Sequence, residues 1–414
     1  MERYSSQAAE VEALAYFHGK VYLYRGCQGS YVGVAIADGS FNRCRLICFQ
    51  IRAGVKLMKS AIHIKPLLAA IAVISWIGAA QAQARPPSPE IPSANPAPTT
   101  GPLRLDVVAS QPDGKPIGGL SQQQFHVSVN GKPESIVGFQ AVEGAAAQVE
   151  VILVIDTVNA GFSTVAYERT EIERFLKQNQ GRLAHPVSIA VITDTGMRMT
   201  PQSSTDGNEL AAYLDKMNFP MRTIVRSTGF WGWVEKFQIS ATGLLNLATA
   251  EQRRPGRKLL IWVSPGWPLL SGVDVQLTNK EQDSFFSNLL TISTALREAR
   301  ITLYSVDPLG NEDADGYRTT FYKEFTKGVR SPQHMQMGNL ALQVFALETG
   351  GRIFNSSNGI TREIGQAVQD ADAYYTIAVD PPPASSPNEY RSISVTVNEG
   401  ALTARTMTGY YTQP

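Results

Sequence analysis

From residue 149 onward, short apolar runs alternate with segments whose apolar residues fall on one face of a helix. Residues 149–155 form an apolar run broken only by Glu150, which is typical of a strand covered on both faces. Further strands are predicted at 187–193, 258–263 and 301–306, and helices at 167–178, 208–217, 239–250, 285–299 and 340–349. This alternation predicts an α/β fold with a central, mostly parallel sheet between helix layers, which binds ligands at the carboxyl ends of its strands.

Two flanking segments show the two-residue alternation of β-strands instead. Residues 103–145 carry turn signals at Asp113-Gly114 and Asn130-Gly131, and predict a small β-sandwich module before the α/β domain. Alternating runs return at 373–379, 390–397 and 404–411. These C-terminal strands either complete the edge of the central sheet or pair with the N-terminal module. The predicted boundary of 149–412 groups them with the α/β domain.

A secretion signal is predicted inside the chain, at residues 58–84. Lys59 and Lys65 precede the 14-residue apolar run 67–80, and small residues at alternate positions follow it up to Ala84. This order matches a cleaved signal peptide, and the run is shorter than the roughly 20 residues that a transmembrane helix needs. We therefore expect no stable membrane span after cleavage, the alternative being a retained anchor. Residues 85–102 are Pro-rich and predict an extended linker.

Residues 1–57 precede this signal and contain all three cysteines, Cys27, Cys44 and Cys48. They show no period sustained enough to predict a folded domain. Because signal peptides act at the N-terminus, we expect that translation begins at Met58 and that residues 1–57 are a mis-assigned extension. The alternative is a small cytoplasmic domain before a signal anchor. In either case the exported part is free of cysteine and needs no oxidative folding.

The overall charge excludes one class of partner. The chain has 37 Lys and Arg against 36 Asp and Glu, and 43% of its residues are hydrophobic. A protein that binds nucleic acid by neutralising phosphates is usually clearly basic, and a disordered chain has low hydrophobicity. We therefore predict folded domains and no nucleic-acid partner.

Short segments spread in order over residues 113–411 carry a resemblance to a known family. They are Asp113-Gly114-Lys115-Pro116, Gly119-Leu120, Phe125, Asn130-Gly131-Lys132-Pro133, Val154-Ile155-Asp156, Gly256-Arg257-Lys258-Leu259-Leu260, Tyr304-Ser305-Val306-Asp307, Glu348-Thr349-Gly350-Gly351-Arg352, Tyr374-Tyr375 and Gly409-Tyr410-Tyr411. With them the chain resembles von Willebrand factor type A domains, and in particular the secreted type A-related proteins of Acidobacteria. The resemblance implies a Rossmann-like domain that binds partners.

The family's metal-ion-dependent adhesion site is degenerate in this sequence. The resemblance places oxygen ligands at Asp-x-Ser-x-Ser, a later Thr and a Ser/Thr-Asp-Gly, but only Asp156 remains of the two carboxylates. Val158 and Ala160 replace the serines, and 264–266 reads Ser-Pro-Gly. Thr228 is a candidate for the Thr ligand, and Mg²⁺ prefers an octahedron of such oxygens. We therefore predict no cofactor, with Mg²⁺ binding through Asp156 as the alternative.

Two residues of this loop have simpler interpretations. Asp156 is more simply a buried carboxylate that accepts backbone N–H groups, and Asn159 offers a neutral oxygen out of register with the motif.

Ser264 follows a strand as a nucleophile does, but Trp262 stands where that turn requires glycine. The three histidines of the exported part are not spaced as metal ligands. We predict that the protein is not an enzyme.

An aromatic cluster is the candidate contact surface. Trp231 and Trp233 are predicted in a loop between elements, and Trp267 follows the third strand, so all three are expected near the carboxyl ends of the strands. The alternative is that Trp231 and Trp233 pack beneath the loop. We expect an exported protein, periplasmic, outer-surface or extracellular, that contacts an unknown protein or cell-surface ligand. Two competing functions are a structural or assembly role in the cell envelope and metal-dependent adhesion through Asp156.

Overall fold

A computed structural model describes residues 22–25, 31–35, 46–50, 101–144, 148–217, 230–267, 277–310 and 320–412. The chain divides into two compact units, residues 1–85 and 86–414. The predicted signal peptide and nearly all of the predicted linker lie outside the described residues. Within the first unit, β1 (Tyr22–Arg25), β2 (Tyr31–Ala35) and β3 (Leu46–Gln50) form an antiparallel sheet. Strands therefore form in a segment for which the sequence predicted no folded domain, while the start at Met58 stays a prediction.

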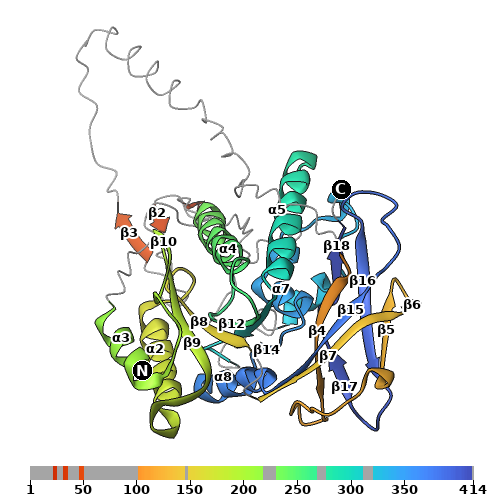
Figure 1. Cartoon of the computed structure of the whole chain (residues 1–414). Coiled ribbons are helices and arrows are strands. Elements are labelled where there is room, and N and C mark those ends of the chain that lie inside the picture. The colour runs from red at the N-terminus through yellow and green to blue at the C-terminus, as the bar shows by residue number, and fades with distance from the viewer. Residues whose placement is uncertain are drawn as a thin grey trace, which may run out of the picture. The chain divides into compact units, whose positions relative to one another are not determined.

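The second unit is mixed α/β and contains a seven-stranded sheet in the order β10-β9-β8-β12-β13-β14, with β11 also paired to β9 (Figure 1). Its strands are β8 (Val149–Asp156), β9 (Arg182–Thr193), β10 (Gly196–Met199), β11 (Ser204–Asp206), β12 (Arg257–Val263), β13 (Ile301–Val306) and β14 (Ile353–Phe354). The pairings from β9 through β8, β12 and β13 to β14 are parallel. Both β10 and β11 are antiparallel to β9, so the sheet is mixed.

Helices pack on both faces of this sheet because its strands are apolar on both sides. One core joins the sheet to α2 (Phe162–Leu176), α3 (Gly207–Lys216) and α8 (Ile360–Val368). The other joins it to α4 (Phe230–Glu251), α5 (Asn279–Glu298) and α7 (Leu342–Glu348). The 3-10 turns are η1 (Gln122–Gln124), η3 (Gln178–Gly181), η4 (Phe321–Phe325), η5 (Pro332–His334), η6 (Met337–Leu340) and η7 (Gln369–Ala371). Among the described residues, no helix is long and apolar enough to cross a membrane.

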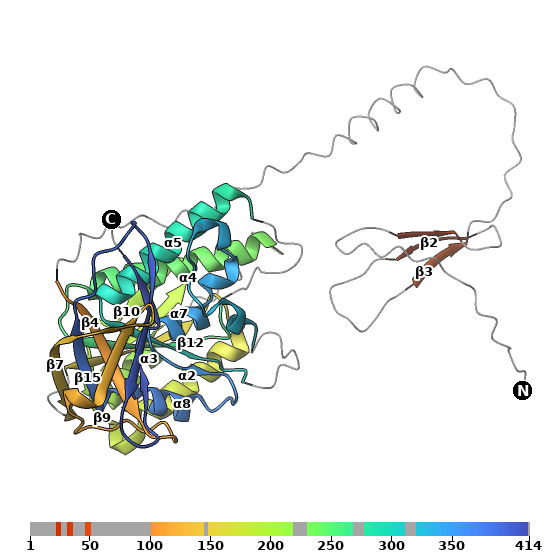
Figure 2. The ribbon, with the colours of Figure 1, turned by 90° about the vertical axis from the view of Figure 1, so that its right-hand side faces the viewer.

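The remaining strands form two four-stranded sheets, β17-β4-β15-β7 and β18-β16-β5-β6 (Figure 2). The strands from the N-terminal side are β4 (Leu103–Ser110), β5 (Phe125–Val129), β6 (Lys132–Glu134) and β7 (Ile136–Glu143). Those from the C-terminal side are β15 (Ala373–Val379), β16 (Tyr390–Val397), β17 (Thr403–Arg405) and β18 (Gly409–Tyr411). The inward side chains of both sheets form one hydrophobic core, so the two sheets make a sandwich.

This pairing decides where the C-terminal strands belong. Strand β15 lies between β4 and β7, and β16 lies between β18 and β5. None of the described C-terminal strands pairs with the central sheet. Of the two placements that the sequence left open for 373–411, pairing with the N-terminal strands is the one observed. The physical reason is that β15 has two edges to satisfy, and β4 and β7 pair with them, with one register shift against β7 between Ala378 and Val379.

Candidate functional site

The loop that follows β8 is built around the carboxylate of Asp156. This side chain is fully buried and accepts four hydrogen bonds, two at each oxygen. Oδ1 accepts the backbone N–H groups of Val158 at 3.0 Å and Asn159 at 2.9 Å. Oδ2 accepts Nδ2 of Asn159 at 2.8 Å and Nε1 of Trp262 at 3.0 Å. A carboxylate has about four acceptor positions, so the chain itself satisfies this group.

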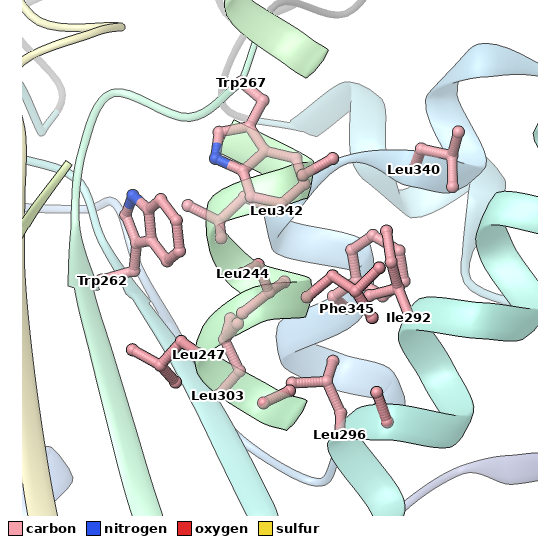
Figure 3. Packing of buried hydrophobic residues seen from close by; sticks show 14 of the residues in the cluster. Leu244, Leu247, Trp262, Trp267, Ile292, Leu296, Leu303, Leu340, Leu342 and Phe345 are labelled. Atoms are coloured by element: carbon pink, nitrogen blue, oxygen red, sulfur yellow. The ribbon is translucent and has the colours of Figure 1, made fainter. Parts of the chain in front are cut away.

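The register of the sheet brings Trp262 to this carboxylate. In the parallel pair of β8 and β12, Trp262 lies opposite Val154, which shares a face with Asp156 two residues further along the strand. The indole packs in the core beneath α4, and its ring centroid lies 5.5 Å from that of Trp267 (Figure 3). Strands β8 and β12 are also where the order of the sheet reverses, which is the place where open α/β sheets bind ligands.

Two more bonds fix the loop to its neighbours. Asn159 also donates from Nδ2 to Oγ of Ser240 on α4, at 2.9 Å. Thr157 donates from Oγ1 to the carbonyl oxygen of Ile192 at the end of β9, at 2.7 Å. Oδ1 of Asn159 is buried and has no hydrogen-bond partner among the described residues. The loop is therefore held between β9 and α4, with one unused acceptor.

Of the remaining positions that the resemblance assigned to the adhesion motif, the structure describes 158, 160 and 264. Val158 and Ala160 are buried side chains of the core. Ser264 is buried, and its Oγ accepts the N–H of Gly266 at 3.1 Å. Thr228 lies outside the described residues. Within the parts of the chain that the structure describes, no group of three acidic, histidine or cysteine side chains is arranged to hold a metal ion. The buried-carboxylate interpretation of Asp156 agrees with these contacts.

The aromatic cluster differs from the prediction in two ways. Helix α4 begins at Phe230, so Trp231 and Trp233 are helical instead of lying in a loop. Trp233 is 51% exposed, and the Trp231 side chain lies outside the described part. Trp267 is buried against Phe237 and Phe345, with ring centroids 5.9 and 6.1 Å away. The chain turns inward after β12, so Trp267 packs under the edge and cannot be a surface contact.

Sequence reasoning missed a buried acidic residue next to this loop. Glu168 on α2 is fully buried, and neither of its carboxyl oxygens has a hydrogen-bond partner among the described residues. Burial raises the pKa of Glu168 well above its usual range, and the negative charges of Asp156 and Asp307 raise it further. Burial therefore makes the charged form of Glu168 more costly than that of an exposed glutamate. The signal in the sequence was its spacing, since Val165, Glu168 and Ile172 share the apolar face of a helix.

Two large, exposed hydrophobic side chains of the described residues, Phe162 and Trp233, belong to the helices next to the Asp156 loop. Phe162, the first residue of α2, directly follows the Asp156 loop and is 77% exposed. Trp233 lies seven residues before Ser240 on α4, which is about two helical turns, or roughly 10 Å along the axis. Because Ser240 binds the loop through Asn159, both aromatic side chains belong to elements that border the loop.

Comparisons with known proteins give only weak likenesses. No protein-family model matches the chain, and no curated protein matches it. Among solved structures, proximal thread matrix protein 1 from the mussel byssus is similar at 13% identity and a TM-score of 0.31, covering 59% of this chain and 51% of that one. The pilus adhesin SpaC from Lactobacillus rhamnosus GG is similar at 10% identity and a TM-score of 0.32, covering 77% and 48%. The chain thus spans about half the length of each, and similarity this weak assigns neither a family nor a function.

Proposed function

We propose that this chain is an exported, Rossmann-like type A protein that binds a protein or cell-surface partner without a metal ion. The contact surface is the carboxyl edge of the central sheet, with Phe162 and Trp233 on either side of the Asp156 loop. The protein is not an enzyme in this proposal, and it uses no cofactor.

The fold supports this proposal through the order of its strands. Without β11, the strands of the central sheet can be numbered 1 to 6 along the chain, as β8, β9, β10, β12, β13 and β14. Across the sheet they then lie in the order 3-2-1-4-5-6. That order is the one found in doubly wound α/β domains, which bind at the point of reversal. The antiparallel β10 departs from a purely parallel sheet.

The single observation that carries the binding surface is the exposure of Phe162. An aromatic ring that is 77% exposed at the first position of a helix contributes little to the fold, and aromatic residues are enriched in the energetic centres of interfaces. The metal-free mode rests on the four donors that already surround Asp156. A cation would have to displace the N–H groups of this chain.

The test compares capture of partners from cell-envelope extract by the wild-type chain, the Phe162→Ser/Trp233→Ser double variant and a Val137→Ser control. Val137 is a 56% exposed hydrophobic residue of β7 in the β-sandwich, away from the proposed surface. We expect one saturable partner that the double variant loses, that the control retains and that EDTA leaves bound. Equal capture by the double variant would refute the surface, and loss of capture in EDTA would favour metal-dependent adhesion instead.

A structural role in the envelope is the second candidate. It is favoured by the sandwich, because each of its two sheets combines strands from the N-terminal and the C-terminal side of the second unit. In that case the Val137→Ser variant, and not the double variant, would lose its partner.

A further inference from the structure

A cavity of about 50 Å³ lies between the α/β part and the sandwich. Its walls come from the last turns of α5, the end of α7, and strands β4, β16 and β18. Tyr390, Tyr410 and Tyr411 supply aromatic surface, and three arginines, Arg104, Arg297 and Arg300, line the same space. Nothing in the proposed contact surface uses these residues.

Three of the titratable groups in the cavity, Arg300, Asp106 and Glu348, together contribute no net charge. Arg300 donates from Nε and Nη2 to the two carboxylate oxygens of Asp106, at 3.1 and 2.5 Å. Such a two-bond pair of arginine and carboxylate is strong and geometrically fixed. Burial raises the pKa of Glu348 to about 8, so this carboxyl group is mostly protonated at neutral pH. Neither Asp106 nor Glu348 therefore neutralises a further arginine.

Arg297 is the mostly buried arginine of this cavity from which no carboxylate among the described residues accepts a hydrogen bond. Its side chain is 16% exposed, and its nearest described carboxylate oxygen is Oε1 of Glu298 at 3.8 Å, which is beyond hydrogen-bonding distance. Glu298 also accepts a hydrogen bond from Nε2 of Gln252 at 3.2 Å. Burial lowers the pKa of Arg297, but a guanidinium does not lose its proton in proteins. A mostly buried charge of this kind is costly unless an anion pairs with it.

We propose that this cavity binds a small carboxylate group, held by two hydrogen bonds from the guanidinium of Arg297. The third arginine, Arg104, is exposed, so Arg297 is the one mostly buried guanidinium of the lining without a hydrogen-bonded carboxylate, and a single such group matches a monoanion better than a divalent oxyanion. The volume also fits, because about 50 Å³ corresponds to roughly four water-sized atoms and acetate has four non-hydrogen atoms. The group comes either from a free acid or from the side chain of an aspartate in a partner, since both present the same CH₂–carboxylate unit.

Calorimetric titration of the full chain tests this proposal with acetate, its neutral isostere acetamide, sulfate and a blocked aspartate, N-acetylaspartate amide. We expect saturable binding of acetate and none of acetamide. Arg297→Gln should weaken acetate binding at least tenfold, while Arg253→Gln, an exposed arginine outside the cavity, should leave it unchanged. Binding of the blocked aspartate at least as tight as that of acetate identifies a partner side chain as the source, and weaker binding identifies a free acid.

Several results would overturn the proposal. These are equal binding of acetamide, tighter binding of sulfate, and unchanged acetate binding by the Arg297→Gln variant. If that variant does not fold, Ser293→Leu is the second one, because it fills the cavity from α5 and leaves the arginines of the cavity unchanged. Acetate binding that survives in the Ser293→Leu variant also contradicts the site.

Discussion

The indole N–H of Trp262 is the donor whose removal best tests how the Asp156 loop is held. Trp262→Phe keeps an aromatic ring in the core but deletes the 3.0 Å bond to Oδ2 of Asp156. A hydrogen bond to a charged group contributes about 1.5–3 kcal/mol, and the volume lost between indole and phenyl adds about 1–2 kcal/mol. We therefore expect the free energy of unfolding to fall by about 3–5 kcal/mol.

Trp267 provides a matched control a few residues away. It is also buried, but its Nε1 has no partner among the described residues. Trp267→Phe loses the same volume and also removes an unsatisfied donor, and these two effects offset each other to within about 1 kcal/mol. Urea unfolding of both variants, followed by circular dichroism, measures the difference. If the two substitutions lower the unfolding free energy equally, the bond to Asp156 contributes nothing and the reasoning is refuted.

Buried groups elsewhere and the degenerate adhesion motif give three further predictions. The folded-state pKa of Glu348 is about 8 against 4.5 unfolded, so the free energy of unfolding should fall by about 5 kcal/mol as pH rises through this window. Glu348→Gln should abolish that part of the pH dependence in a series of urea melts, and an unchanged slope would contradict it. Gly351→Ala would place Cβ 1.7 Å from the Leu303 carbonyl oxygen and should cost more than about 3 kcal/mol in thermal unfolding. Gly365→Ala on α8, with open space around it, should instead stabilise by about 0.5–1 kcal/mol, and equal effects of the two would disprove the clash. Millimolar Mg²⁺ should leave the melting temperature unchanged, and a rise would revive the adhesion site.

The sheet was largely predictable because its signal is local. Each predicted strand from 149 to 306 falls within an observed one, since a strand buried on both faces must be apolar over its length. Helix starts were less predictable. Helix α4 begins at Phe230, nine residues before the expected 239, because its first turn holds phenylalanine, tryptophan and glycine, which have lower helix propensity than the residues that follow. The aromatic pair was therefore placed in a loop.

The sandwich and the site could not be derived in the same way because both depend on long-range pairing. Strand β15 alternates as any half-buried strand does, and nothing local says that Leu105 will lie opposite Ile377. Asp156 was identified from the sequence. Trp262, which donates a hydrogen bond to it, was interpreted only as a residue that is incompatible with a nucleophile turn. That role follows from the register of β8 on β12, which composition and spacing do not reveal.

The donors that surround Asp156 make metal binding at this carboxylate costly. To free a single carboxylate oxygen for a cation, the chain must give up two hydrogen bonds, which together contribute about 3–6 kcal/mol. The ion would regain little, because Val158 and Ala160 bring no side-chain oxygen and Mg²⁺ prefers six such ligands. The N–H groups thus neutralise the buried charge permanently and hold the loop rigid. In the proposed function, a binding edge held in this way is formed before any partner arrives, so we expect its affinity to depend on exposed aromatic surface such as Phe162 and not on the supply of a cation.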